Sequence, residues 1–322
     1  MSVNLNEVKR AIVEETPKKI GRIRKGWELT KSSWQVLVLD KELISLPLIG
    51  MMLSLLTIGV FGLLYILCVI RIHTGGFNPV GANFEFSSSD VPIWLNLIFF
   101  LTIYFVMSFI ANVIAAAVIF GANERFCGGD PTVRGSVAGA FCKLKPLAAY
   151  TLMMSVIGVI LKTIEERVPF AANIAVQVFG GLWSVANVFA IPVITLSEGS
   201  VSPFDATKES VGIIRRIWGE SVVADLGVSI IEVLAICAYI ALWTLLSFIA
   251  IPLSLSLSMT IALGTSAFLG LIGVSLIFST LSSILKAALY RFATTGTAPL
   301  TFSHNMLNAT VNPKKSRRIL GF

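Results

Sequence analysis

Two carboxylates inside an apolar stretch are the residues of this sequence best suited to chemistry. Asp225 and Glu232 lie in "SVVADLGVSIIEVL" (221–234) with Ser229 between them, so in a helix the three side chains share one face. A carboxylate in mid-bilayer costs at least about 2.5 kcal/mol and is typical of an ion or proton site. If a membrane span begins at Ser221, Glu232 lies about 16 Å along it, near the middle of the bilayer. This interpretation favours a transporter or channel that uses Glu232 and Asp225.

The same stretch also allows both acids to lie at the membrane boundary. Residues 233–251 are uncharged and already long enough to cross a bilayer without any residue from 221–232. Both carboxylates would then face the headgroups, with Lys286 near the inner end of the last span and Arg215 and Arg216 as partners. The sequence leaves the buried and the boundary interpretations open.

Other reactive constellations are missing from the sequence. The chain has only two histidines, His73 and His304, in loops predicted on opposite sides of the membrane, which excludes a haem held by two intramembrane histidines and a histidine-rich metal site. No phosphate-binding glycine loop, zinc-protease helix or Gly-x-Ser-x-Gly elbow occurs. We therefore predict no catalytic residue, no metal site and no cofactor; an intramembrane lipid-modifying enzyme would need a constellation that the sequence does not supply.

The elements that position the two acids are membrane spans. Of 322 residues, 55% are hydrophobic and 13% charged, and the mean hydropathy is +0.84, which is too apolar for a soluble domain. A span needs about 20 apolar residues, so the 53 uncharged residues from Val233 to Leu285 predict two spans joined by a turn near Pro252. Six spans are predicted in all, in hairpins over about 43–123, 146–197 and 221–295.

The positive charges mark one side of the membrane. Of the 25 lysines and arginines, 22 lie in alternate segments, at 1–42, 121–146, 197–220 and 286–322. This distribution predicts that both termini are cytoplasmic, and it assigns the net charge of +7 to the membrane surface and not to nucleic acid. We divide the chain into a basic N-terminal segment (1–42), a six-span domain (43–299) and a basic tail (300–322).

An internal repeat relates the spans. "ANVIAAAVI" at 111–119 and "ANVFAIPVI" at 186–194 share six of nine residues, and each leads into a Gly-then-Pro turn, "GGDP" at 128–131 and "GSVSP" at 199–203. The last span ends likewise in "GTAP" at 296–299. Asp130 or Ser202 is expected to cap the next helix, with proline in its first position. A chance match imposed by similar loops is the alternative. Asn112 and Asn187 either hydrogen-bond between helices or line a path.

Each hairpin is preceded by an amphipathic helix predicted to lie in the headgroup plane. One face carries Val211, Ile214, Trp218 and Val222, and another carries Val133, Val137, Ala140 and Leu144. The fold class is therefore all-α: six transmembrane helices as three hairpins, each preceded by an interfacial helix, plus a C-terminal interfacial segment. The predicted contacts with anionic lipid are Lys18, Lys19, Arg22, Arg24, Lys25, Arg215 and Arg216.

The segment "RKGWELTKSSWQVLVLDKELISLPLIG" (24–50) resembles the start of a family of six-span bacterial and archaeal membrane proteins of unknown function. That family is more distantly similar to the membrane domain attached to some glycerophosphodiester phosphodiesterases. The resemblance rests on the Gly-Trp, Ser-Trp, Asp-Lys-Glu-Leu and Leu-Pro-Leu elements. It implies topology and the cytoplasmic membrane of a prokaryote, but no activity, because the soluble phosphodiesterase domain is absent.

These observations favour a non-catalytic membrane protein, a scaffold or accessory subunit of a membrane assembly that also contacts anionic lipid on its cytoplasmic face. The expected partners are the lipid bilayer, anionic lipids, and other membrane proteins or further copies of the chain. A transporter or channel for a small solute or lipid is the alternative.

Overall fold

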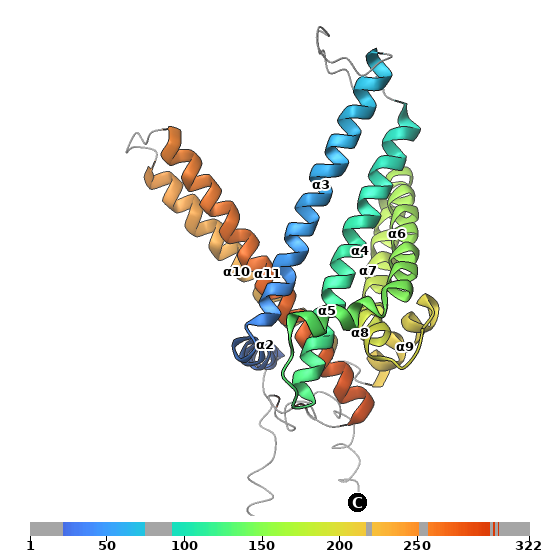
Figure 1. Ribbon diagram of the computed structural model, residues 1–322, viewed down its shortest axis with the longest axis vertical. Coiled ribbons are helices and arrows are strands. Elements are labelled where there is room, and N and C mark those ends of the chain that lie inside the picture. Colours follow the sequence, from blue (N-terminus) through green and yellow to red (C-terminus); the bar gives the residue numbers. More distant parts are fainter. Residues whose placement is uncertain are drawn as a thin grey trace, which may run out of the picture. The chain divides into compact units, whose positions relative to one another are not determined.

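The computed structural model describes residues 22–74, 92–216, 221–250 and 257–296, together with Pro299 and Phe302. Every regular element in these ranges is a helix (Figure 1). Six of the helical segments are long and apolar enough to cross a membrane. The helices are α2 (Arg22–Leu39), α3 (Glu42–Thr74), α4 (Ile93–Phe126), α5 (Val133–Phe141), α6 (Leu144–Arg167), α7 (Phe170–Ala186), α8 (Ala190–Leu196), α9 (Pro203–Arg216), α10 (Ser221–Ala250) and α11 (Leu257–Thr295).

The chain divides into two compact units. One unit spans Asp40–Val211 and the other combines Met1–Leu39 with Gly212–Phe322, so that the division falls within α9. We call them the central unit and the terminal unit.

Helix α4 is the axis of the central unit. It contacts α3 on one side and α6 on the other, and α5 and α8 pack against it (Figure 1). The largest fully buried side chains of this unit gather where α3 and α6 begin and α4 ends, an end that we call the turn end. They are Leu43, Leu46, Ile119, Leu147, Phe189 and Ile194.

Away from the turn end, the long helices of the central unit expose large apolar side chains. Leu56 on α3 is 63% exposed and Leu182 on α7 is 65% exposed. Soluble proteins rarely expose continuous apolar surface of this kind, whereas lipid is the solvent that such helices require. The exposed apolar surface and the helix lengths agree on a multi-pass membrane protein.

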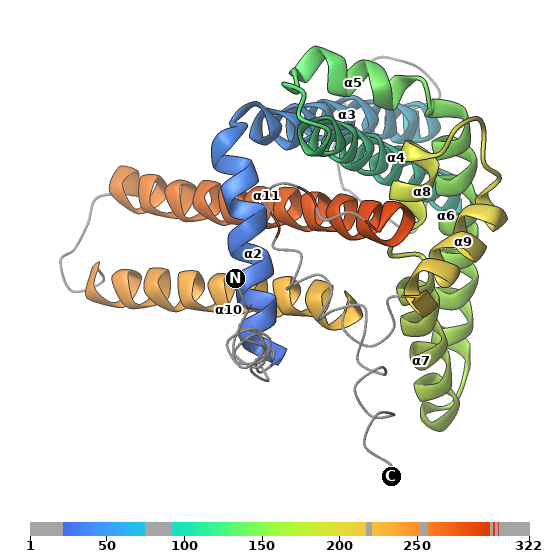
Figure 2. The ribbon, with the colours of Figure 1, turned by 90° about the horizontal axis from the view of Figure 1, so that it is seen from below.

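The terminal unit consists of α2 and the pair α10 and α11. The Tyr239 hydroxyl of α10 donates a hydrogen bond to the carbonyl of Ala267 on α11 at 3.0 Å, which fixes the register of the pair. Helix α2 crosses both helices and contacts each of them (Figure 2). The predicted turn at Pro252 lies outside the described residues.

Glycines stand at the three repeated turns in a conformation that other residues avoid. Gly128, Gly199 and Gly296 have φ of 84°, 89° and 70°, and they are the only glycines with positive φ in the described part of the chain. Each follows a long helical segment, as the "GGDP", "GSVSP" and "GTAP" turns require. A left-handed residue is a common way to end a helix, and glycine adopts it without strain.

The predicted caps after these turns have different outcomes. Ser202 caps α9 as predicted: its hydroxyl accepts from the Asp205 amide at 3.2 Å, and Pro203 is the first helical residue. The expectation for α5 is wrong, because Thr132 caps it and accepts from the Gly135 amide at 3.1 Å, while Asp130 pairs with Arg125.

The predicted apolar faces of the interfacial helices are only partly described. Leu144 was expected on the face of α5, but α5 ends at Phe141 and Leu144 begins α6. On α9, Ile214 is buried and Val211 half-buried. Trp218 and the Val222 side chain lie outside the described residues.

Candidate functional site

A cluster of charged groups joins three elements at the turn end of the central unit. Asp40 lies in the turn before α3, and its carboxylate accepts hydrogen bonds from two nitrogens of Arg125, in the last turn of α4; the Nε donor lies 2.5 Å from Oδ2. A guanidinium nitrogen of Arg125 also donates to Asp130 at 2.8 Å. Glu42 accepts from the backbone amide of Val133, the first residue of α5, at 3.1 Å. We call these four side chains the Asp40 cluster.

The Asp40 cluster is an anchor and not a reactive centre. The Asp40 side chain is 4% exposed, and both of its oxygens are held by the planar guanidinium, which matches a carboxylate bidentately. Asp40 is therefore almost inaccessible to a substrate, and its charge is compensated within the protein. In the described residues no three His, Cys, Asp or Glu side chains are placed to hold a metal ion.

A second anchor joins the α5–α6 turn to the Gly199 turn. The Lys143 ammonium donates to the carbonyls of Ser197 and Gly199 at 2.7 and 2.6 Å. Cations near a helix C-terminus stabilise its unpaired carbonyls, and α8 ends at Leu196. The Lys143 ammonium is therefore bonded to backbone carbonyls of the protein itself.

The repeated asparagines both bond to protein groups. Asn112, on α4, donates to the Thr151 hydroxyl of α6 at 2.9 Å. Asn187 follows α7 directly; its amide donates to the Trp183 carbonyl at 2.8 Å and accepts from Thr207 of α9 at 2.7 Å. The two side chains thus bond to different helices, and neither amide bonds to the other.

Helix α9 provides hydrogen-bond partners for the short break between α7, which ends at Ala186, and α8, which begins at Ala190. The Ser210 hydroxyl, fully buried, accepts from the amide of Phe189 at 3.0 Å. Buried backbone N–H groups need such partners, and none is supplied within a helix at this break. Thr207 and Ser210, one turn apart on α9, therefore hold the chain where the repeat departs from a continuous helix.

The predicted pairing of Glu232 with Lys286 stays a prediction, and the cavity beside Glu232 shows where this acid lies on α10. Ile231 and Ala235 line the same cavity as Val274 and Ile277, so Glu232 lies at their level. Glu232 is half-buried, and the side chain of Asp225 lies outside the described residues.

The predicted lipid contacts are described only in part. Arg215 and Arg216 are exposed in the last turn of α9. Lys18 and Lys19, and the side chains of Arg22, Arg24 and Lys25, lie outside the described residues.

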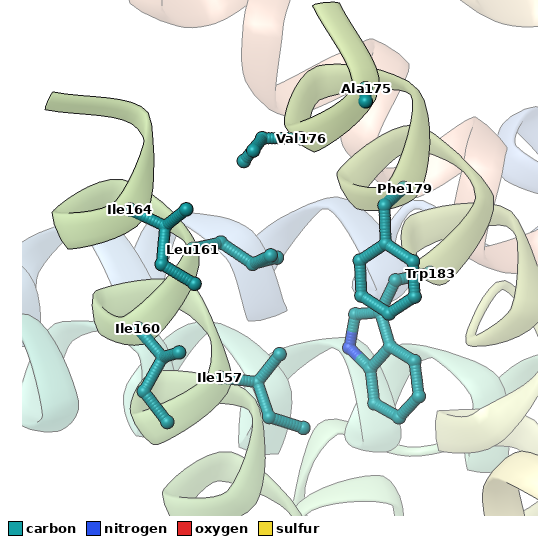
Figure 3. A pocket seen from close by; sticks show the side chains of 8 residues that line it. All are labelled: Ile157, Ile160, Leu161, Ile164, Ala175, Val176, Phe179 and Trp183. Atoms are coloured by element: carbon teal, nitrogen blue, oxygen red, sulfur yellow. The ribbon is translucent and has the colours of Figure 1, made fainter. Parts of the chain in front are cut away.

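An apolar groove separates α6 from α7. It has a volume of about 500 Å³, and Figure 3 shows side chains from both helices facing it, including Leu161, Phe179 and Trp183. The indole nitrogen of Trp183 is the only polar side-chain atom of this lining, and it is buried without a hydrogen-bond partner. The groove therefore offers a surface to hydrocarbon and no charge to a headgroup.

A second cavity lies where α2 crosses α10 and α11. Its volume is about 440 Å³, and it differs from the groove in having a lysine in its lining. We call it the α2 pocket. It is lined by Thr30, Lys31, Trp34, Ile231, Ala235, Val274, Ile277, Phe278 and Leu281. Sequence reasoning missed it, because Lys31 lies apart from the cluster of basic residues at 18–25 and its apolar neighbours in the pocket come from distant helices.

A family model matches residues 92–300, about two thirds of the chain and all the described helices from α4 to α11. The chain belongs to the family of unknown function DUF6159. No curated protein and no solved structure matches it. The DUF6159 match begins after residues 24–50, which carry the resemblance noted above, and it shows no link to glycerophosphodiester phosphodiesterases.

Proposed function

We propose that this DUF6159 chain is a non-catalytic membrane protein, a scaffold or accessory subunit of a membrane assembly, whose cytoplasmic face binds anionic lipid. The observation that carries the proposal is a difference between acidic and basic side chains around the amphipathic helices: several acids bond to protein groups, whereas most cations are exposed and form no ion pair in the described part of the chain. Acids there bond to the protein: Asp40 and Asp130 to Arg125, Glu42 to the Val133 amide, and Asp205 to Ser202.

Arg125 and Lys143 bond to the protein, but six other cations in the same segments are exposed to the surroundings. Glu198 and Glu209 in these segments are also exposed, but the exposed cations outnumber these two acids. Each cation near an anionic membrane surface contributes about 1 kcal/mol to lipid attraction. Exposed, and without an ion pair in the described part of the chain, are Lys41, Arg134, Lys145, Lys208, Arg215 and Arg216.

The topology supports a single basic face. In our proposal α3 and α4, α6 and α7–α8, and α10 and α11 are three hairpins, and α2, α5 and α9 are the interfacial helices that precede them. Each hairpin returns the chain to the side from which it started, so the Gly128, Gly199 and Gly296 turns all face one leaflet. The positive-inside rule makes that leaflet cytoplasmic, with both termini on the same side. We also retain from the resemblance the prokaryotic plasma membrane and the likeness to the membrane domain of glycerophosphodiester phosphodiesterases.

A test is to extract the full-length chain with its surrounding lipid in polymer nanodiscs and compare that lipid with the bulk membrane. Phosphatidylglycerol is expected to be enriched, and the triple variant Arg134→Gln, Arg215→Gln, Arg216→Gln is expected to lose the enrichment. The matched control is Lys162→Gln with Arg167→Gln, at the other end of α6. Cross-linking mass spectrometry on the same sample is expected to show a partner chain. A chain that elutes alone with bulk lipid composition contradicts the proposal.

Transport through Glu232 is the rival hypothesis. If α2 lies in the headgroup plane, its contact with α10 at Ile231 and Ala235 puts Glu232 at the membrane boundary. In our proposal Glu232→Gln leaves the behaviour of the protein unchanged. A pH-dependent solute flux that disappears in Glu232→Gln, with expression intact, would replace the scaffold by a transporter.

A further inference from the structure

The α2 pocket combines three elements around an apolar interior. Helix α2 contributes Lys31 and Trp34, α10 contributes Ile231 and Ala235, and α11 contributes the remaining apolar side chains. Cavities of about 300–1,000 Å³ are typical of small-molecule sites, and this one has about 440 Å³. An engineered cavity of about 150 Å³ holds a benzene molecule, so the α2 pocket has room for several methylene groups.

The position of the pocket along the hairpin matches the depth of lipid headgroups. Helix α10 ends at Ala250, which is 15 residues beyond Ala235 and 19 beyond Ile231. At about 1.5 Å per residue these separations are about 23 and 29 Å, close to the 30 Å of a hydrocarbon core. With the far end of the hairpin at one boundary of the core, the α2 pocket therefore lies at the other.

Charge at the rim favours an anion. Lys31 is exposed, forms no ion pair in the described part of the chain, and has no acidic residue beside it in the lining. Its ammonium is a compact point charge of the kind that binds phosphate. Trp34, 46% exposed, stands next to it, and tryptophan is enriched at the membrane–water interface.

We propose that the α2 pocket is a seat for one anionic phospholipid, with the phosphate at Lys31 and part of an acyl chain between α10 and α11. Two features argue for this occupant: an apolar interior one hydrocarbon thickness from the far end of the hairpin, and an exposed lysine at its mouth that forms no ion pair in the described part of the chain. The inference rests on the proposed lipid-binding function and specifies one site for it.

The groove between α6 and α7 is a cavity in the same chain that has no side chain able to select one lipid headgroup over another. It is slightly larger, yet no charged side chain lines it, and its one polar atom is the buried Trp183 nitrogen (Figure 3). Any acyl chain can cover that groove, whatever the headgroup. The two cavities therefore provide matched controls within one protein.

The experiment is native mass spectrometry of the full-length chain in detergent, titrated with dioleoyl phosphatidylglycerol or dioleoyl phosphatidylcholine. The first phosphatidylglycerol is expected to bind more tightly than the first phosphatidylcholine. Lys31→Gln is expected to weaken the first phosphatidylglycerol about fivefold, which corresponds to about 1 kcal/mol, and to leave phosphatidylcholine unchanged. The control Lys162→Gln removes an exposed charge that neither lines the pocket nor belongs to the proposed lipid-binding cations, and it is expected to leave the first binding step unchanged.

Filling the pocket tests its interior. Ala235→Phe is expected to abolish the first tight binding step, whereas Ala175→Phe, which fills the groove between α6 and α7, is expected to preserve it. Equal affinity for both lipids, or identical behaviour of Lys31→Gln and Lys162→Gln, overturns the inference. Because Lys31 is exposed, its substitution is not expected to disturb folding, so the charge comparison decides even if Ala235→Phe misfolds.

The failures of this inference and of the proposed function can be told apart. Lipid enrichment in nanodiscs that depends on Arg134, Arg215 and Arg216, together with an inert Lys31→Gln, removes the seat and leaves the general function standing. One tightly bound phosphatidylglycerol that depends on Lys31, without any enrichment of surrounding lipid, supports the seat and removes the general function.

Discussion

Replacing Arg125 by methionine tests whether the Asp40 cluster holds the central unit together. Methionine keeps most of the length of the arginine stem but removes the guanidinium that binds both oxygens of Asp40. The Asp40 side chain is 4% exposed, so the substitution leaves a buried carboxylate without its cation. Its second partner, Asp130, is 89% exposed and contributes little, because solvent screens such a pair.

The expected loss follows from this asymmetry in burial. Removing one partner of a buried ion pair typically costs about 3–5 kcal/mol, because the remaining charge is uncompensated. Asp40→Asn is expected to cost less, about 1.5–3 kcal/mol, the range for hydrogen bonds to charged groups. In that variant Arg125, 29% exposed, still has water and Asp130 as partners. The double variant is expected to be more stable than Arg125→Met alone, since it buries no unpaired carboxylate.

Thermal unfolding followed by tryptophan fluorescence measures these differences. The central unit spans residues 40–211, a length for which 1 kcal/mol shifts Tm by about 2–4 °C. Arg125→Met should therefore lower Tm by about 6–20 °C. A shift below about 2 °C, or a double variant less stable than Arg125→Met, would refute the view that the guanidinium compensates a buried charge.

Three further predictions use the same unfolding measurement. Gly199→Ala is expected to cost about 1–2 kcal/mol because φ is 89°, whereas Gly212→Ala, inside α9 with open space around it, is expected to stabilise by about 0.5–1 kcal/mol; equal signs would contradict this. Ser210→Ala is expected to cost about 1–3 kcal/mol because the Phe189 amide loses its buried acceptor, and an unchanged Tm would show another partner. Asn112→Val is expected to cost about 1 kcal/mol, and a gain in stability would argue against interhelical bonding.

The membrane spans were predictable because the criterion for them is local. Length and hydropathy decide whether a helix can cross a bilayer, and six helical segments meet both conditions. The Ser202 cap was predictable for the same reason, since cap and proline are neighbours in sequence. The cap of α5 was not, because Arg125, on α4, takes Asp130 away from it.

Residue spacing predicts close packing less well than it predicts spans. Small residues along a membrane helix allow close approach, but spacing does not tell which of them faces a neighbour. A side chain at Gly50 would meet Ile114 at 2.7 Å and one at Gly270 would collide with Tyr239, whereas nothing lies within 4 Å of the corresponding position at Gly59.

The Asp40 cluster escaped prediction because its partners are 85 residues apart. The available signal was an acid in the "LDKEL" segment just before the first span, and an arginine at the end of the second. An acid and a base that border consecutive spans on the same side of the membrane are candidates for an ion pair. The sequence has several cations and acids at these borders, so it does not identify the pair. Only the packing of α3 against α4 selects Arg125 for Asp40.

The placement of the anchors explains how the central unit holds together in lipid. Lipid tails solvate an apolar helix as well as another apolar helix does, so the hydrophobic effect does not drive helices together in a membrane. Helix association there depends on close packing and hydrogen bonds. In this unit three polar links, Asp40 to Arg125, Ser210 to Phe189 and Lys143 to Ser197, lie at the turn end, with the fully buried side chains. The distal halves of α3 and α7 instead expose apolar surface. Away from the turn end the Tyr65 hydroxyl of α3 still donates to Asn96 of α4 at 2.7 Å, but the large exposed side chains there are apolar. This part of the unit therefore presents lateral surface to lipid or to a partner helix.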